Sequence, residues 1–443
     1  MEIPDEIVVP SSELEKLRER AFAGLERNCV PVFGSGGKRV LTEGGIYTGI
    51  WLECGPHESL TLAPFLPEVA LMSHRIFYLH QREDGQFPAY ILGDRAGYSQ
   101  IQQVVPIAAT AWELARMTGS GSFLQESYEA CSRWEKWLVR HRDPRGLDLL
   151  EAWCEYDTGH DNSPRWKSVP KLWPREEARN CPDGVMPRFA PDLSATLYGM
   201  RIALAEMADA LGRKEEQAEY CAAAERTRRN IGKYCFDPER EFYFDRIPGS
   251  GFCGIVGDAG LRVLGEHVPS QVVADRIFRR YILNPEAFWT PYPLPSIAAN
   301  DPEFMYPPCL NCWGGASQAL AALRTLRYFE FYGYGKELRI LMTRWLEAIL
   351  RTSGFQQQMD PFTGEFSTSP GYSPCMCVAL EFGARLSEPE GLSMGAFVHD
   401  VAELVDLRRR HAGIRQKFPH QRSTLLLLIL SIGVTAMVGS HIY

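Results

Sequence analysis

DLSATLYGMRIALAEMADALG (192–212) and KEEQAEYCAAAERTRRNIGKY (214–234) are neighbouring stretches that indicate the class of fold. In both, apolar residues recur at the three- and four-residue intervals that put them on one face of a helix. A single residue, Arg213, separates them, and so short a link between long helices makes them antiparallel neighbours. The sequence therefore predicts a helical hairpin over 192–234.

The same pattern returns along most of the chain. Residues 101–118 and 123–141 form a second predicted pair, joined by a short Gly-Ser link. Residues 313–332 and 335–352 form a third. Repeated helix pairs predict an all-α barrel of paired helices. A fourth, shorter pair is expected around Val272–Tyr281, and a further helix over 12–28.

Strand signals are few by comparison. The clearest are REFYFDR at 240–246 and FCGIVG at 252–257. Long loops lie between the helix pairs, and loops on a rigid scaffold commonly carry chemistry. The loops richest in polar and aromatic residues are 47–62, 142–191, 284–312 and 353–373.

The bulk composition excludes some classes of protein. The 443 residues carry a net charge of −8, which argues against a general nucleic-acid binder. The first residues have neither the basic nor the apolar segment of a secretory signal, so we expect a cytoplasmic protein whose 12 cysteines are reduced. The pairs Cys309–Cys312 and Cys375–Cys377 lack the supporting histidines of a zinc site, so no metal is expected.

The end of the chain differs from the rest. A barrel domain is expected over 1–395, a basic helical segment over 396–422 and an apolar tail over 423–443. The tail contains no Asp, Glu, Lys or Arg and approaches the length that crosses a bilayer. Three interpretations stay open: a membrane anchor that tethers a cytoplasmic body, a buried terminal helix, and a tail unrelated to the domain.

The stretch EYDTGHDNSPRW at 155–166 is the strongest candidate for chemistry. Cleavage of a glycosidic bond needs a carboxylic acid that protonates the leaving oxygen, and Asp161 suits that role. Gly159 allows a tight turn before it and Pro164 fixes φ after it. The alternative interpretation is an Asx-turn in which Asp161 is only a structural acceptor.

Neighbouring side chains would tune this acid. Trp153, Tyr156 and Trp166 would exclude water from the site and raise the pKa of a nearby carboxyl. Arg165 would orient a carboxylate or a sugar hydroxyl. We expect the ring of His160 to lie in solvent, although a histidine at this place could also tune the acid.

DNSPRW at 161–166, preceded by LVRHRDPRGLDLLEAW, resembles the glycoside hydrolase family that includes processing α-glucosidase I, mannosylglycerate hydrolase and glucosylglycerate hydrolase. CFDPEREFYFDR, FWTPYPLPSIAANDPEF and GFQQQMDPFTGE resemble further motifs of that family, so the resemblance extends over residues 45–386. It implies a six-hairpin (α/α)6 toroid barrel with minor β-hairpin insertions.

The resemblance also implies roles for individual residues. It makes Asp161 the general acid and places Gln103, Trp313 and Arg188 at or near sugar-contacting positions. Trp51 lies in the first loop that would enter the site, and we expect it to contact substrate as well. Taken from the residues alone, Trp313 is equally a core tryptophan that begins a helix, and Arg188 a partner in a surface salt bridge.

The sequence departs from the family at the general base. Matching Asp360-Pro361 to the family's Asn-Pro puts Gln357 where the family has its glutamate, and an amide cannot accept a proton as a carboxylate does. Gln357 is then expected to contact the substrate. Glu365, the acid nearest in sequence, and Glu53, in the first loop, are the preferred substitutes for the base.

Two functions of different classes remain. The first is an inverting glycoside hydrolase that acts on an α-linked glucoside or mannoside and needs no cofactor. The second is a barrel that binds carbohydrate without cleaving it, because Gln357 has replaced the base. An isomerase with paired histidines is disfavoured, since the 10 His form no visible constellation. The sugar, the linkage and the oligomeric state stay open.

Overall fold

The computed structural model describes residues 11–173, 178–181, 187–352 and 354–387. The expected segments 396–422 and 423–443 lie outside these residues. The part of the chain described up to Leu386 forms one compact unit. Within the described ranges, no helix combines the length and the apolar character that crossing a bilayer requires.

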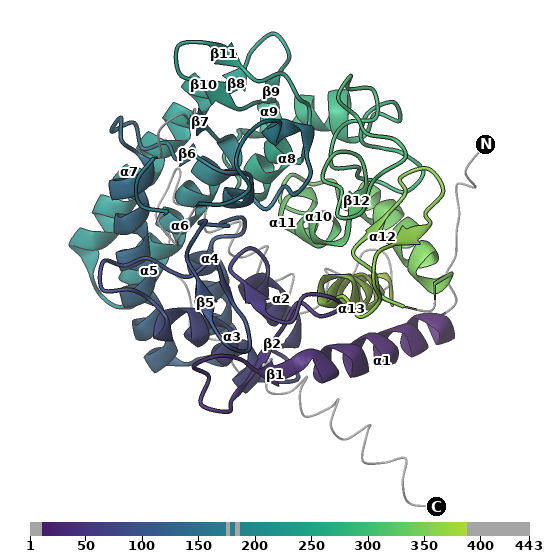
Figure 1. Ribbon diagram of the computed structural model, residues 1–443, viewed down its shortest axis with the longest axis horizontal. Helices are drawn as coiled ribbons and strands as arrows, with labels where there is room; N and C mark the ends of the chain where they lie inside the picture. Colours follow the sequence, from purple (N-terminus) through teal and green to yellow (C-terminus); the bar gives the residue numbers. More distant parts are fainter. Residues whose placement is uncertain (1–10, 174–177, 182–186, 353, 388–443) are drawn as a thin grey trace, which may run out of the picture. The chain divides into compact units, whose positions relative to one another are not determined.

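The helices of this unit form two concentric layers (Figure 1). α2, α4, α6, α8, α10 and α13 surround the centre, and α3, α5, α7, α9 and α12 lie outside them. This arrangement is the expected toroid of helical hairpins. The helices are α1 (Ser11–Asn28), α2 (Gly55–Leu62), α3 (Pro67–Leu79), α4 (Ile107–Thr118), α5 (Gly121–Arg142), α6 (Pro191–Ala210), α7 (Lys214–Tyr234), α8 (Asp258–Gly265), α9 (Gln271–Ile277), α10 (Ala319–Arg324), α11 (Leu326–Phe329), α12 (Gly335–Leu350) and α13 (Ser373–Ser387).

Short strands pair in the loops between the helices. All the pairs are antiparallel and few strands exceed two residues, so the sheets only brace the loops. The sheets are β1–β2 (Cys29–Pro31, Arg39–Leu41), β3–β4–β5 (Ile50–Trp51, Tyr90–Ile91, Ala96–Gly97), β6–β7–β10–β11 (Glu151–Ala152, Arg188–Phe189, Arg246–Ile247, Gly251–Phe252), β8–β9 (Phe236–Asp237, Phe242–Tyr243) and β12–β13–β14 (Ser317–Gln318, Gln358–Met359, Phe366–Ser367).

The hairpins end and begin where the sequence allows a sharp turn. Between α4 and α5, Gly119 takes the left-handed conformation (φ 64°) that commonly ends a helix. Ser120 follows, and its hydroxyl accepts a hydrogen bond from the Phe123 N–H, which caps the start of α5. Two residues therefore reverse the chain and set the two helices antiparallel.

Several predicted boundaries were wrong. Residues 101–106 are not helical but form a loop ending at Pro106, in which the Ile101 N–H binds the Asp157 carboxylate (3.0 Å). Residues 313–318 are loop and strand, so the third pair begins only at Ala319. Residues 55–62, expected as loop, form the inner helix α2.

A buried ion pair holds one of the long loops to the barrel. Arg142, at the end of α5, and Asp157 are both fully buried, and the guanidinium donates to both carboxylate oxygens. Asp157 also accepts from the N–H groups of Ile101, Trp153 and Cys154. One carboxylate therefore joins a helix end and two loops.

We expect Asp157→Ala to lower the free energy of unfolding by about 3–5 kcal/mol, because it leaves Arg142 charged and unpaired in the core. Urea denaturation measures this. The control is Asp94→Ala, which breaks the exposed Arg95–Asp94 pair (59% and 74% exposed) and should cost under about 1 kcal/mol. Equal losses in the two variants would contradict the role given to the buried pair.

Candidate active site

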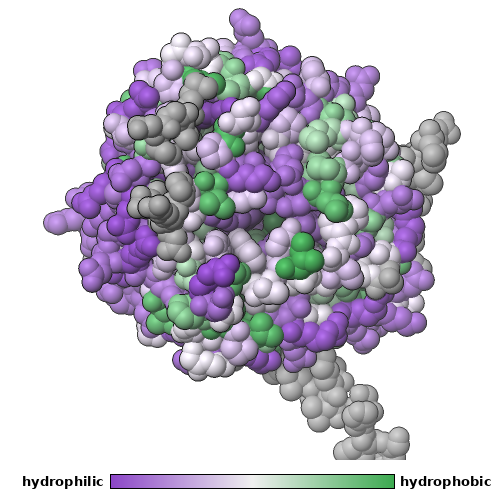
Figure 2. Space-filling view, in the orientation of Figure 1, coloured by the Kyte–Doolittle hydropathy of each residue, from purple (hydrophilic) through white to green (hydrophobic). Residues whose placement is uncertain are grey.

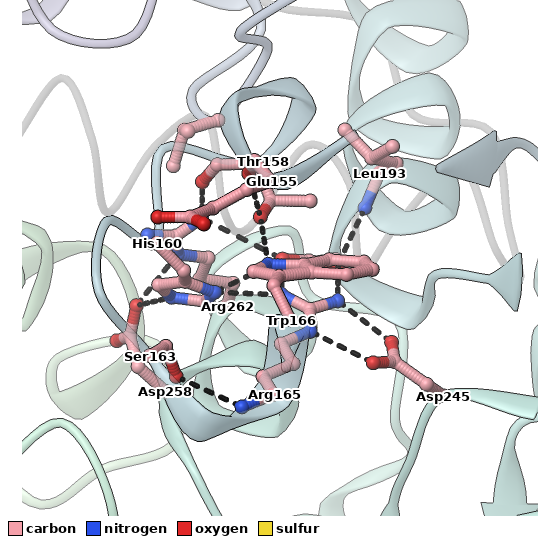
Figure 3. Close-up of polar contacts among 12 residues, drawn as sticks. Glu155, Thr158, His160, Ser163, Arg165, Trp166, Leu193, Asp245, Asp258 and Arg262 are labelled. Atoms are coloured by element: carbon pink, nitrogen blue, oxygen red, sulfur yellow. Dashed lines mark hydrogen bonds and ion pairs between the residues drawn. The ribbon is translucent and has the colours of Figure 1, made fainter. Parts of the chain in front are cut away.

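Residues 155–166, here called the acid loop, are fixed by Arg165. Its guanidinium donates two hydrogen bonds to Asp192 (2.7 and 2.8 Å) and two to Asp245 (2.8 and 2.7 Å). Figure 3 shows the Arg165 side chain reaching toward Asp245 beneath the Trp166 ring. Such bidentate pairs are both strong and specific in geometry. Arg165 therefore orients carboxylates of the protein itself, and its guanidinium is engaged by them.

His160 belongs to the same buried network, so the expectation of a solvent-exposed ring was wrong. The side chain is 3% exposed. Nδ1 accepts from Arg165 (2.6 Å), which leaves Nε2 to donate to Asp258 (2.9 Å; Figure 3). Burial, together with the nearby Arg262 charge, lowers the pKa of His160 to about 3. The imidazole is therefore neutral and acts as a structural link.

Asp161 projects from this rigid loop and is only partly exposed. Asn311 donates from Nδ2 to its Oδ2 (2.8 Å), and the Trp313 N–H donates to its backbone carbonyl (3.1 Å). Burial, and then the charge of Glu53, raise the pKa of Asp161 to about 7. A carboxyl of this kind carries a proton near neutral pH, as a general acid must.

Glu53 packs against the acid loop. A Cβ on Gly159, which takes a φ of 64°, would lie 2.4 Å from the Glu53 Oε2 atom, so only glycine fits there. Glu53 is 6% exposed and accepts from Gln102 (3.0 Å) and Arg324 (3.2 Å). The carboxylate of Glu53 thus forms an ion pair with the Arg324 guanidinium.

Two further buried acids surround this pair. Glu58 is 1% exposed, and burial raises its pKa to about 8. Burial, followed by the charges of Glu58 and Glu53, raises the pKa of Glu43 well above its usual range; its Oε1 accepts from the Tyr372 hydroxyl (2.8 Å). Both carboxyls are therefore protonated at neutral pH, and Glu53 differs from them by its arginine partner.

Gln357 lies in the same place. It is 5% exposed and donates from Nε2 to the Asn311 side chain (2.7 Å). Its Oε1 accepts from the Tyr47 hydroxyl (3.0 Å). Through Asn311 the structure therefore joins Gln357 to Asp161. By contrast, Glu365 is exposed at the turn of the β13–β14 hairpin, where its carbonyl accepts from the Asp360 N–H (2.9 Å), and is not brought against Asp161.

Several predicted sugar-contacting side chains are engaged by the protein. Gln103 is 2% exposed and accepts from the Trp134 indole. Trp153 is buried under the Arg142 guanidinium, 4.2 Å from its ring centre. Trp166 is buried between Arg165 and Arg188, and its Nε1 donates to Thr158 (3.0 Å).

The remaining candidates differ in burial and in what they contact. Trp313 is 2% exposed and lies 5.0 Å from His160, before the helix rather than in it. Arg188 donates to the Arg165 carbonyl and lies near the buried Asp245, so it is no surface pair. Tyr156 and Trp51 are half-buried, and Trp51 meets Tyr47 edge-on at 5.7 Å.

A cavity of about 410 Å³ adjoins the acid loop. Figure 2, in the orientation of Figure 1, shows a hollow near the centre of the face in view, with hydrophilic side chains above it and hydrophobic ones on either side. Among the described residues, no group of three His, Cys, Asp or Glu side chains is placed to hold a metal ion. The cavity lining includes His160, Arg165, Arg188, Asp245, Asp258 and Trp313.

Three residues of the site, Glu43, Tyr47 and Asn311, carry no signal that we read from the sequence. Asn311 lies two residues before Trp313 and takes a positive φ (49°), which asparagine tolerates better than most residues. Glu43 and Tyr47 flank the Gly-Gly pair at 44–45. Because both residues are far from 155–166 in sequence, their place in the site could not be predicted.

The chain is similar to known glycoside hydrolases in sequence and in structure. The model of the mannosylglycerate hydrolase MGH1-like glycoside hydrolase domain matches residues 47–373. Two solved structures of GH63 mannosylglycerate hydrolase from Thermus thermophilus are similar, one in complex with glucose (20% identity, TM-score 0.67) and one with Tris and D-glycerate (19%, 0.67). Each similarity covers 82% of this chain and 99% of the other.

Neutral trehalase Nth1 from Saccharomyces cerevisiae is similar as well, with 14% identity and a TM-score of 0.64 over 93% of this chain and 86% of that one. At such identities, the structural likenesses establish the toroid fold alone.

We expect Asp161→Asn to stabilise the protein at alkaline pH. The folded pKa of about 7 lies above the ordinary 3.8, so ionised Asp161 destabilises the fold. This penalty is absent below pH about 4, develops as the pH rises and is complete above pH about 7. The gain of the variant over wild type should grow by about 1–2 kcal/mol between pH 5 and pH 8, discounted for partial exposure.

Urea denaturation at both pH values measures this gain, with Asp94→Asn as the exposed control. A gain that is the same at both pH values would contradict the raised pKa.

Proposed function

This chain belongs to the mannosylglycerate hydrolase MGH1-like glycoside hydrolase family, and from that premise we propose that it hydrolyses an α-linked glucoside or mannoside with inversion. The observation that carries the proposal is the pair of unlike carboxyls, a largely buried Asp161 of raised pKa near an arginine-paired Glu53. Glycoside cleavage with inversion requires two carboxyls in different roles, one that donates a proton to the leaving oxygen and one that activates a water.

Asp161 is the general acid in this proposal. Its carboxyl is protonated near neutral pH and would donate to the oxygen of the leaving group. Arg165 and His160 hold the acid loop from beneath, so that the donor meets the glycosidic oxygen at a fixed place. Positioning of this kind supplies a large part of the rate acceleration.

Glu53 is the general base in this proposal. It is paired with Arg324, whereas burial raises the pKa of Glu43 and of Glu58 and so favours their protonated forms. Glu365 is disfavoured as the base because it lies exposed on a hairpin turn. An inverting reaction needs a water between the two carboxyls, which are then roughly 6.5–9.5 Å apart.

The sugar is proposed from the relatives. Glucose is bound in one structure of the Thermus thermophilus enzyme, and D-glycerate in another. Half-buried Trp51 and Tyr47, which meet edge-on, offer aromatic faces against which a sugar ring packs. Gln357 would contact the same sugar. We expect the aglycone to differ from those of the relatives. The family's Trp-Arg-Gly-Pro-x-Trp motif is here Trp313-Gly-Gly-Ala-Ser-Gln318, which lacks the arginine and the second tryptophan.

We expect Asp161→Asn to lower kcat/KM about 10²–10⁴-fold, since the leaving oxygen loses its proton donor. For wild type, the rate should fall as the pH rises above about 7, where Asp161 loses its proton. A panel of α-glucosides and α-mannosides, including glycerate and disaccharide substrates, measures both effects. NMR of the first-formed anomer tests inversion.

Asp94→Asn is the control and should match wild type. Unchanged hydrolysis in Asp161→Asn would refute its role. Sugar binding without turnover on any substrate would instead favour the binding barrel.

We expect Glu53→Gln to lower kcat by about 10² or more, because no carboxylate then activates the water. Glu365→Gln should stay within about twofold of wild type, since the side chain is exposed at a turn. Steady-state kinetics on the substrate identified above, with sugar binding by calorimetry, separate lost chemistry from lost binding. The reverse order of the two variants would move the base to the hairpin.

A further inference from the structure

A continuous chain of side-chain hydrogen bonds ends on the acid. The Tyr47 hydroxyl donates to Gln357 Oε1 (3.0 Å), Gln357 Nε2 donates to Asn311 Oδ1 (2.7 Å), and Asn311 Nδ2 donates to Asp161 Oδ2 (2.8 Å). Two amides thus stand between a phenol and the carboxyl. Tyr47 and Gln357 are 310 residues apart in sequence, and Asn311 and Asp161 are 150 residues apart.

The direction of this chain is set by its two ends. The Oδ2 atom of Asp161 accepts a hydrogen bond both in the ionised carboxylate and in the acid protonated on Oδ1, so Asn311 presents its NH₂ group to Asp161 and its oxygen to Gln357. Gln357 must then donate with its nitrogen, and its oxygen is free to receive the Tyr47 hydroxyl. A residue at 357 therefore has to donate at one atom and accept at the other. Glutamine does so, whereas an ionised glutamate cannot donate.

The backbone on either side of the chain is fixed. The Gln357 N–H donates to the Thr368 hydroxyl (3.0 Å), and its carbonyl accepts from the Ala319 N–H (2.9 Å). The Asn311 carbonyl accepts from Asn162 of the acid loop (3.1 Å). These backbone hydrogen bonds beside the β12–β13 strand pair thus position the Gln357 amide. They are independent of the Arg165 network that holds the acid loop.

We propose that Gln357 and Asn311 are positioning residues for Asp161, which hold its Oδ2 atom and so leave Oδ1 to carry the proton toward the substrate. This inference rests on the proposed function of Asp161 as the acid. The Gln357 amide then has a role of its own in positioning Asp161, beyond being the residue that stands where the family has its base. The bond from Asn311 also favours the ionised carboxylate, and so limits the rise in the pKa of Asp161.

The test uses Asn311→Ala and Gln357→Met, which break the chain at different links without adding charge. We expect the pKa of Asp161 to rise roughly half to one unit in Asn311→Ala and less in Gln357→Met. We also expect kcat to fall roughly 10–100-fold, because the acid is less well placed. Carbon NMR of ¹³C-carboxyl aspartate in the full chain, with Asp161 assigned by its loss in Asp161→Asn, follows the titration directly.

Gln356→Met is the matched control. This neighbouring glutamine donates to the Thr368 carbonyl (2.7 Å) and stands outside the chain. Its Asp161 titration and pH–rate profile should match wild type. Two different links are broken, so a folding failure in one variant leaves the other to decide.

Gln357→Glu separates the proposal from its rival. If position 357 were a vacated base, the glutamate would raise kcat; we expect it to lower kcat, because the chain loses its donor. An increase in kcat would overturn the inference, as would an unchanged Asp161 titration in both Asn311→Ala and Gln357→Met. The titration needs no substrate, so it decides the inference even if no glycoside is hydrolysed and the proposed function fails.

Discussion

The pairing of Arg165 with two aspartates is the interaction on which the site depends. Asp192 stands at the start of α6 and Asp245 near β9 and β10, while Arg165 belongs to the acid loop. A buried arginine loses its hydration, and only several well-oriented acceptors offset that loss. The geometry that satisfies the guanidinium therefore also fixes the loop. Removing either aspartate would leave part of a buried charge unpaired.

Near the Arg165 network, several acidic side chains lie close together and few of them are paired with a basic side chain. Glu43, Glu58 and Asp161 have raised pKa values because they are buried close to one another, and Glu53 is paired with Arg324. Carboxyls placed for stability alone would be exposed or paired. The cluster thus stores unfavourable free energy in the fold, which is the usual condition of groups tuned for proton transfer. The arginine network beneath provides the rigidity that holds the acids together.

The sequence predicted the parts of the fold that local pattern determines. Periodicity is a local property, so the hairpin of α6 and α7 followed from it, as did α4 with α5 apart from its first turn. Residues 313–318 were misassigned because their apolar character serves burial in a loop. The motif singled out Asp161 as a candidate, but it gave no sign of the residues that contact it. Asn311 lies 150 positions away, and only the closed ring brings it to the acid. The burial of His160 was not predicted for the same reason, since its partner Asp258 lies 98 positions away at the start of α8.

Glu365 and Glu53 show the limit of reasoning from proximity in sequence. Glu365 is close in sequence to Gln357, but it lies at the turn of the β13–β14 hairpin, where its side chain is exposed. Glu53 is 271 positions from its partner Arg324, yet the first loop and the inner helix α10 meet at the centre of the toroid. In such a fold the members of a site come from loops spread around the ring. Side chains that are far apart in sequence therefore meet there, as Glu53 does with Arg324 and Asn311 with Asp161, and Gln357 joins them through Asn311.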